Sequence, residues 1–181
     1  ADSIAYARER RAGENITYEV ADLREPKGGP FDLAIAMGNT LSLLDCEEDV
    51  PKAFDAALRQ LPPGGIFFVH VVNYAALEAG GPRQKVARRK SEEVDTVIVK
   101  NMIPLGGGGP SLVSFAKFEC TGGAWETSGS QAVLLNLRRP FLEECAAGSG
   151  FEIEGVYGDY DRSAFDEKNS PDLLLVLRKS G

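Results

Sequence analysis

Two apolar segments of the chain each end in polar residues that could contact a small molecule. Phe31 to Met37 runs into Gly38-Asn39-Thr40, and Ile66 to Val72 runs into Asn73-Tyr74. Glycine lets a backbone approach a ligand closely, and an asparagine side chain can both donate and accept hydrogen bonds. These residues suit the recognition of a polar group such as an amine, although Gly-Asn is also a common turn pair.

Both segments are nearly continuous apolar runs, which predicts parallel strands covered on both faces. Between them, one apolar helical face begins near Glu47 and ends at Pro62-Pro63. That face consists of Val50, Phe54, Ala57, Leu58 and Leu61. A strand, a helix and a second strand predict an α/β sheet, in which ligands bind beyond the carboxyl ends of the strands. We therefore expect the polar residues after both strands to lie at one site.

Asp22 is the strongest single candidate for a ligand contact. It follows Ile16 to Ala21, which reads as another strand. A carboxylate at a strand end can accept a hydrogen bond from an exocyclic amine, and that bond would offset the cost of its partial burial. Aspartate is also favoured in an Asx turn that closes a loop, so Asp22 could be either a ligand contact or a turn residue.

His70 is the only histidine and invites the role of a general base. It lies three residues before Asn73, and the alternation of a strand turns it away from that residue. We therefore interpret His70 as a core residue rather than a catalytic one.

The lysine and arginine run Arg83 to Lys90 is followed at once by acids, which favours a solvated helix or a mobile lid.

After Asn73 the pattern changes to antiparallel strands joined by glycine turns. The predicted strands are Val94 to Ile103, Leu112 to Cys120 and Gln131 to Leu137. Gly106 to Gly109 is followed by Pro-Ser-Leu, which favours a hairpin turn over a phosphate-binding loop. The remaining predicted elements are helices at Ile4 to Ala12 and Pro140 to Ala147, and strands at Phe151 to Tyr157 and Leu173 to Leu177.

The net charge of −7 argues against nucleic-acid binding as the main function of the protein. No apolar run approaches the ~20 residues that cross a bilayer, and the start of the chain lacks the layout of a signal peptide, so we expect no membrane partner and a cytoplasmic location. The cysteines Cys46, Cys120 and Cys145 are far apart and odd in number, which predicts reduced thiols and no metal site.

The chain resembles class I S-adenosylmethionine-dependent methyltransferases over nearly its whole length. Motifs occur in the order of that family, from the acidic turn at Val20 to Pro26 and the strand and loop at Phe31 to Asn39 to the turn at Leu61 to Gly65. Phe151 to Asp161 and Ser170 to Lys179 resemble the closing strand pair found in small-molecule N-methyltransferases.

The resemblance implies a single methyltransferase domain over residues 1–181, with a Rossmann-like sheet and an antiparallel β insertion at about 93–138. It implies S-adenosylmethionine as cofactor and methyl transfer to a small molecule, with nitrogen as the favoured acceptor atom. The alternative is a non-catalytic methyltransferase-like subunit that needs a partner chain, and a homo-oligomer is compatible with either. Nucleic acid is disfavoured because Gly38 to Leu41 stands where nucleic-acid amino-methyltransferases carry an Asn/Asp-Pro-Pro-aromatic motif.

Site roles follow from the same resemblance. We expect Asp22, Leu23, Met37 and Gly38 to bind the cofactor, and Asn39, Asn73 and Tyr74 to form the catalytic, substrate-facing group. Val72 stands where relatives carry an arginine, so a carboxylate contact is not expected there. Among the other candidates, Tyr74, Tyr157 and Tyr160 could form an aromatic wall, with ordinary packing favoured, and Arg138-Arg139 could recognise an anion.

One departure from the family concerns the start of the chain. The glycine-rich loop that follows the family's first strand is not in the sequence, and Ala1 to Arg10 resembles the helix after the second strand. We expect an incomplete domain in which Ile16 to Ala21 has no neighbour and Phe31 to Met37 exposes an apolar edge. Weak cofactor binding follows from the missing loop.

Overall fold

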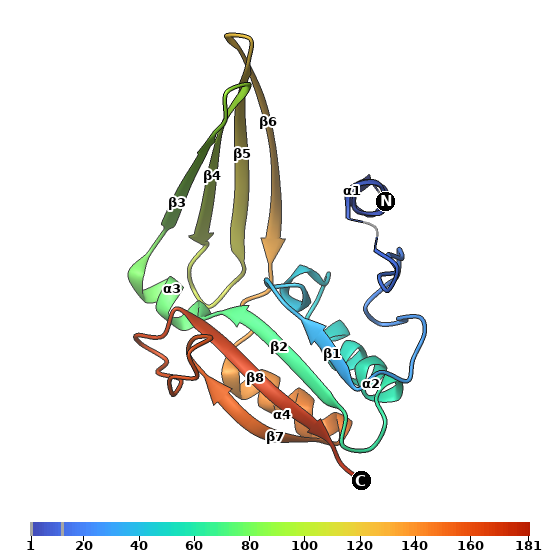
Figure 1. The fold of residues 1–181 in the computed structure, drawn as a ribbon. Helices are drawn as coiled ribbons and strands as arrows, with labels where there is room; N and C mark the ends of the chain where they lie inside the picture. Colours follow the sequence, from blue (N-terminus) through green and yellow to red (C-terminus); the bar gives the residue numbers. More distant parts are fainter. Residues whose placement is uncertain (1, 12) are drawn as a thin grey trace.

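The computed structural model describes residues 2–11 and 13–181 and contains two four-stranded sheets (Figure 1). The main sheet has the order β1-β2-β8-β7, with β1 and β2 parallel and the other pairs antiparallel. Its strands are β1 (Leu33–Ala36), β2 (Ile66–Val72), β7 (Phe151–Tyr157) and β8 (Asp172–Lys179). The inserted sheet is an antiparallel meander of β3 (Arg83–Lys90), β4 (Val94–Pro104), β5 (Ser111–Thr121) and β6 (Ala124–Leu134).

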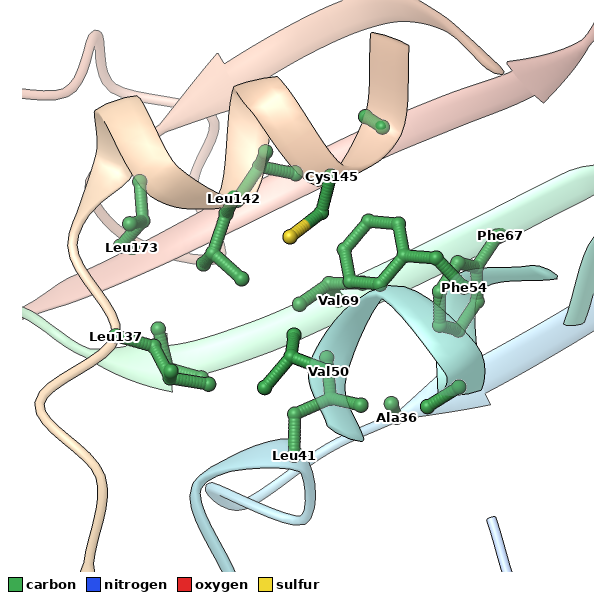
Figure 2. Packing of buried hydrophobic residues seen from close by; sticks show 14 of the residues in the cluster. Ala36, Leu41, Val50, Phe54, Phe67, Val69, Leu137, Leu142, Cys145 and Leu173 are labelled. Atoms are coloured by element: carbon green, nitrogen blue, oxygen red, sulfur yellow. The ribbon is translucent and has the colours of Figure 1, made fainter. Parts of the chain in front are cut away.

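The helices are α1 (Asp2–Arg10), the short 3₁₀ helix η1 (Leu41–Leu43), α2 (Asp49–Gln60), α3 (Tyr74–Gly80) and α4 (Arg139–Ser149). Helices α2 and α4 cover the same face of the main sheet (Figure 1). Figure 2 shows the core between them, where Val50 and Phe54 of α2 meet Leu142 and Cys145 of α4 over Val69 of β2. This architecture confirms the predicted α/β sheet with an antiparallel insertion.

Helix α2 confirms the apolar periodicity of the sequence. Val50 and Phe54 are fully buried, and Leu61, just beyond the helix, is 2% exposed. The Lys179 ammonium donates to the carbonyls of Leu58 and Leu61, at 3.0 and 2.7 Å, and so satisfies acceptors that the helix end leaves free. The helix is thereby fastened to the last strand of the main sheet.

Strand β1 is the edge of the main sheet and is covered on one face only. Ala36 is 5% exposed beneath α2, whereas Leu33 and Ile35, which point to the other face, are 50% and 56% exposed. The expected coverage on both faces is therefore wrong for β1, and the expected apolar edge is confirmed. Phe31 and Met37, on either side of the strand, are also exposed.

Ile16 to Ala21 does not form the predicted strand. Only isolated bridges flank it, between Gly13 and Ile16 and between Asp22 and Glu25. A strand needs a neighbour to accept its backbone hydrogen bonds, and among the described residues none lies beside this segment. The predicted helix before it is present as α1, and its last predicted residue, Ala12, lies outside the described residues.

Arg83 to Lys90 is strand β3, which corrects the expected helix or lid. Pairing with β4 over its whole length decides its structure, and Arg88 forms an ion pair with Asp95 across the two strands at 2.5 Å. Strand β6 begins at Ala124 rather than at Gln131, because it pairs with all of β5. The glycine turns between these strands are as predicted.

The inserted sheet is attached to the rest of the chain at one end (Figure 1). There the Leu135 N–H donates to the Ser42 carbonyl at 2.8 Å, and the Gly108 N–H donates to Glu78 of α3, also at 2.8 Å. Arg138 forms an ion pair with the same Glu78. Within the described part of the chain, no helix is long and apolar enough to cross a membrane.

Candidate functional site

The turn Gly38-Asn39 at the carboxyl end of β1 is held against β2 by two hydrogen bonds to His70, one to its ring and one to its carbonyl. Both residues have φ near +70°, a conformation that glycine and asparagine adopt more readily than other residues. The Gly38 N–H donates to His70 Nδ1 at 3.1 Å, and the Asn39 N–H donates to the His70 carbonyl at 3.3 Å. A side chain at position 38 would point into open space, so the turn leaves room beside it.

The Asn39 side chain joins this turn to the end of β2. Its Oδ1 accepts from the Val72 N–H at 2.7 Å and lies 3.5 Å from the Tyr74 hydroxyl. Its Nδ2 makes no hydrogen bond to any residue of the described ranges, and Asn39 lines a cavity of about 350 Å³ under the inserted sheet. The amide thus fixes the turn with its oxygen and leaves its nitrogen as a donor beside the cavity.

Tyr74 is buried at the start of α3 and faces the same asparagine. Burial raises the pKa of its phenol to about 12, because the phenolate would lose its hydration. The raised pKa means that the neutral phenol contributes stability that is complete below about pH 10, the ordinary tyrosine value, and is lost as the pH rises through 12.

We expect Tyr74 to ionise last of the five tyrosines in an alkaline titration followed by ultraviolet absorbance. Tyr74→Phe should remove this late step, whereas Tyr6→Phe, at a 61% exposed position, should leave it in place. An unchanged late step in Tyr74→Phe would contradict the burial of this phenol.

Asn73 is the N-cap of α3 rather than a free polar group. Its Oδ1 accepts from the Ala76 N–H at 3.3 Å. Its Nδ2 donates to the carbonyls of Glu167 and Ser170, both at 2.9 Å. The residue is 2% exposed and its amide is fully used within the protein, so the structure places it in support of the site and not on a ligand. An asparagine directly before a helix is the signal that could have predicted this role.

His70 belongs to the site, which corrects its interpretation as a core residue. Its side chain is 13% exposed on the face of β2 opposite the core, and its Nδ1 also lies 3.1 Å from the Tyr160 hydroxyl. Because Nδ1 accepts from Gly38, the ring proton of the neutral form sits on Nε2. Nε2 lies 3.2 Å from Asp172 Oδ1 but makes no hydrogen bond there.

Asp22 closes an Asx turn on the chain before β1. Its carboxylate accepts from the Arg24 backbone N–H at 2.8 Å and from the Arg24 guanidinium at 2.6 Å. These hydrogen bonds lower the pKa of Asp22 to about 2. Arg24 also bonds Asp49 at the start of α2. The turn role is therefore present, and the exposed carboxylate keeps lone pairs that a ligand could use.

The predicted cofactor residues do not all meet in one cavity. Gly38 lines the cavity under the inserted sheet, whereas Asp22 lines a polar cavity of about 500 Å³ beside α2. Leu23 lines an apolar cavity of about 340 Å³ along the open edge of β1, and Met37 is 45% exposed. Of the predicted residues, the structure thus brings together Gly38, Asn39 and Tyr74.

Two other candidates have partners within the protein. Arg138 pairs with Glu78, and Arg139 pairs with Glu143 at 2.7 Å. Of the three tyrosines that could form an aromatic wall, Tyr74 lies 3.5 Å from Asn39 and Tyr160 lies 3.1 Å from His70, whereas Tyr157 lies within strand β7.

The sequence matches no protein-family profile and no curated protein. Solved structures do match it. An S-adenosylmethionine-dependent methyltransferase from Clostridium acetobutylicum matches with a TM-score of 0.74 and 13% identity, over 98% of this chain and 69% of that one. CalS10, an amino pentose methyltransferase from Micromonospora echinaspora, matches with a TM-score of 0.70 and 15% identity, over 99% and 71%. The sugar N-methyltransferase KedS8 from Streptoalloteichus matches with a TM-score of 0.71 and 16% identity, over 97% and 67%.

The chain therefore has the fold of class I S-adenosylmethionine-dependent methyltransferases over nearly its whole length. A sugar N-methyltransferase and an amino pentose methyltransferase are among the structures that share it, and the match covers 97% and 99% of this chain.

Proposed function

We propose that this protein transfers a methyl group from S-adenosylmethionine to a nitrogen atom of a small molecule. The observation that carries the proposal is the methyltransferase fold together with the Gly38-Asn39 turn, which lines a cavity under the inserted sheet. Two of the matched proteins act on sugars or amino pentoses, which supports a small acceptor with an amino group.

The residues of this chain would promote the reaction by aligning the acceptor amine with the methyl group of the donor. S-adenosylmethionine supplies a methyl group that is already activated by its sulfonium, so a neutral amine needs no strong base to attack it. Gly38 leaves room for close approach of the donor, and Asn39 Nδ2 is a hydrogen-bond donor at the cavity wall. His70 and Val72 hold this turn in place, which makes them positioning residues.

A second candidate function is a methyltransferase-like subunit that is completed by another chain. The exposed apolar edge formed by Phe31, Leu33 and Ile35 favours it, because an open strand edge pairs readily with further polypeptide. The two functions differ in whether this chain alone binds the donor near Gly38.

The test is a titration of the isotope-labelled chain with S-adenosylmethionine, followed by amide chemical shifts. Because the sequence lacks the glycine-rich loop that follows the first strand in class I methyltransferases, we expect a dissociation constant on the order of 1 mM, equivalent to about −4 kcal/mol. The shifts should centre on Gly38, Asn39 and Leu23. Shifts that are absent or lie elsewhere would reject the proposed function for this chain and leave the subunit.

Asp22→Ala tests the donor contact, with Glu25→Ala as control because both acids line the same cavity. Loss of a hydrogen-bonding partner should weaken donor binding by at least about fivefold, or ~1 kcal/mol, in the first variant only. Equal binding by both variants would leave Asp22 as a turn residue.

A further inference from the structure

We propose that the inserted sheet binds a negatively charged group, a carboxylate or a phosphate, on the acceptor molecule through Lys100 and Lys85. The inference rests on the proposed function for the identity of the ligand as methyl acceptor. The binding site itself stands on the geometry of the inserted sheet.

One row of residues crosses all four strands of the inserted sheet. Lys85 of β3 is opposite Lys100 of β4, Lys100 is opposite Phe115 of β5, and Phe115 is opposite Ser130 of β6. Residues directly opposite one another share a face of a sheet. Lys100, Phe115 and Ser130 line the cavity of about 350 Å³ that also contains Gly38 and Asn39. The row therefore faces the turn where the methyl donor is proposed to bind.

The two lysines carry charges that the protein leaves uncompensated. Like charges directly opposite in a sheet are destabilising. Neither Lys85 nor Lys100 has an ion pair anywhere in ranges 2–11 and 13–181, although acids outnumber bases in the chain by seven. Lys117, two residues beyond Phe115 on the same face, is paired with Glu119 at 2.5 Å. A bound anion would relieve the repulsion between Lys85 and Lys100.

Neighbouring groups strengthen the positive character of this face. Arg83 is opposite Met102 in the adjacent row and likewise has no ion pair among the described residues. The Lys100 ammonium lies 5.4 Å from the centroid of the Phe115 ring, so the aromatic face holds it at the cavity wall. A cationic wall opposite a cationic sulfonium is favourable only when an anion lies between them.

The other residues that line the cavity indicate what the uncharged part of the ligand should be. Its other walls include the apolar side chains of Leu43, Val113 and Leu134 together with the Phe115 ring. Besides the lysine, its polar side chains are those of Asn39, Ser130 and Gln131. The site thus fits a small molecule with an apolar ring and one anionic group, oriented by Lys100 so that its nitrogen faces Asn39.

Three probes of similar ring size test this inference on the 181-residue chain: phenyl phosphate, benzoate and benzyl alcohol. Each probe is titrated into the chain, and its binding is followed by amide chemical shifts. We expect the two anions to bind and to shift the amides of Lys100, Phe115 and Ser130, and the neutral alcohol to cause no saturable shift. A difference between the two anions would identify the preferred charged group. Equal binding of benzyl alcohol and the anions would overturn the proposal.

The double variant Lys85→Gln/Lys100→Gln should bind the preferred anion at least tenfold more weakly. Lys117→Gln is the matched control, because this lysine lies on the same face but is already paired, and it should bind as the parent does. Unchanged binding in the double variant, or an equal loss in the control, would overturn the proposal. Titration with S-adenosylmethionine separates the two proposals: shifts absent at Gly38 contradict the proposed function only.

Discussion

Replacing Phe54 by alanine is expected to lower the free energy of unfolding by about 3–5 kcal/mol, the usual cost of removing a buried phenyl group and leaving a cavity. Phe54 is fully buried and sits between Phe67 of β2 and Phe151 of β7. Its ring meets theirs edge to face, with centroids 5.4 and 6.4 Å apart. Such aromatic pairs add to the stability gained by burial alone.

Urea denaturation of Phe54→Ala and Phe31→Ala measures this difference. Phe31 has the same side chain but is 46% exposed at the edge of the main sheet, so its truncation should cost less than about 1 kcal/mol. Similar losses in the two variants would show that α2 is not anchored by the aromatic cluster. A large loss at Phe54 alone would locate the core of the domain between α2 and the main sheet.

Asn39→Ala is expected to cost about 2–5 kcal/mol of stability and, under the proposed function, to abolish methyl transfer. The variant leaves the buried Val72 N–H without its acceptor, which costs about 1–3 kcal/mol. It also places alanine at φ +70°, which costs roughly 1–2 kcal/mol in the left-handed region. The loss of Nδ2 removes the donor at the cavity wall.

Asn39→Gly separates these contributions because glycine adopts a positive φ without strain. It should recover the conformational part of the lost stability while methyl transfer stays absent. Denaturation and transfer rate are measured on the same samples. Full stability in Asn39→Ala would mean that the turn does not depend on this side chain, and full transfer in Asn39→Gly would remove Asn39 from the catalytic group.

The elements that the sequence predicts well are those with a strong local pattern. Helix α2 has an apolar face at helical spacing, and β2 is apolar except for His70, so both are found at nearly their predicted bounds. Strand β3 has no apolar face, and five of its eight residues are basic, so only its pairing with β4 decides its conformation. Ile16 to Ala21 shows the reverse case, in which strand-like residues find no partner among the described residues.

The site was predicted in part for a similar reason. Strand ends are visible in sequence, which is why Gly38 and Asn39 are found beside a cavity. The contact between His70 and Gly38 joins residues 32 positions apart, and strand alternation gives the face of a residue but not its neighbours. The row of Lys85, Lys100 and Phe115 likewise depends on the register of three strands, which no local pattern in the sequence specifies.

The attachment of the inserted sheet at one end has an evolutionary consequence. Lys100 of β4 and Phe115 of β5 line the cavity and lie outside the buried core, whereas Val113 of β5 belongs to both. Substitutions along these strands can therefore change the shape and charge presented to an acceptor without disturbing the packing of α2 and α4. Under the proposed function, the choice of acceptor can therefore change through substitutions confined to the inserted sheet, while the packing that stabilises the main sheet is retained.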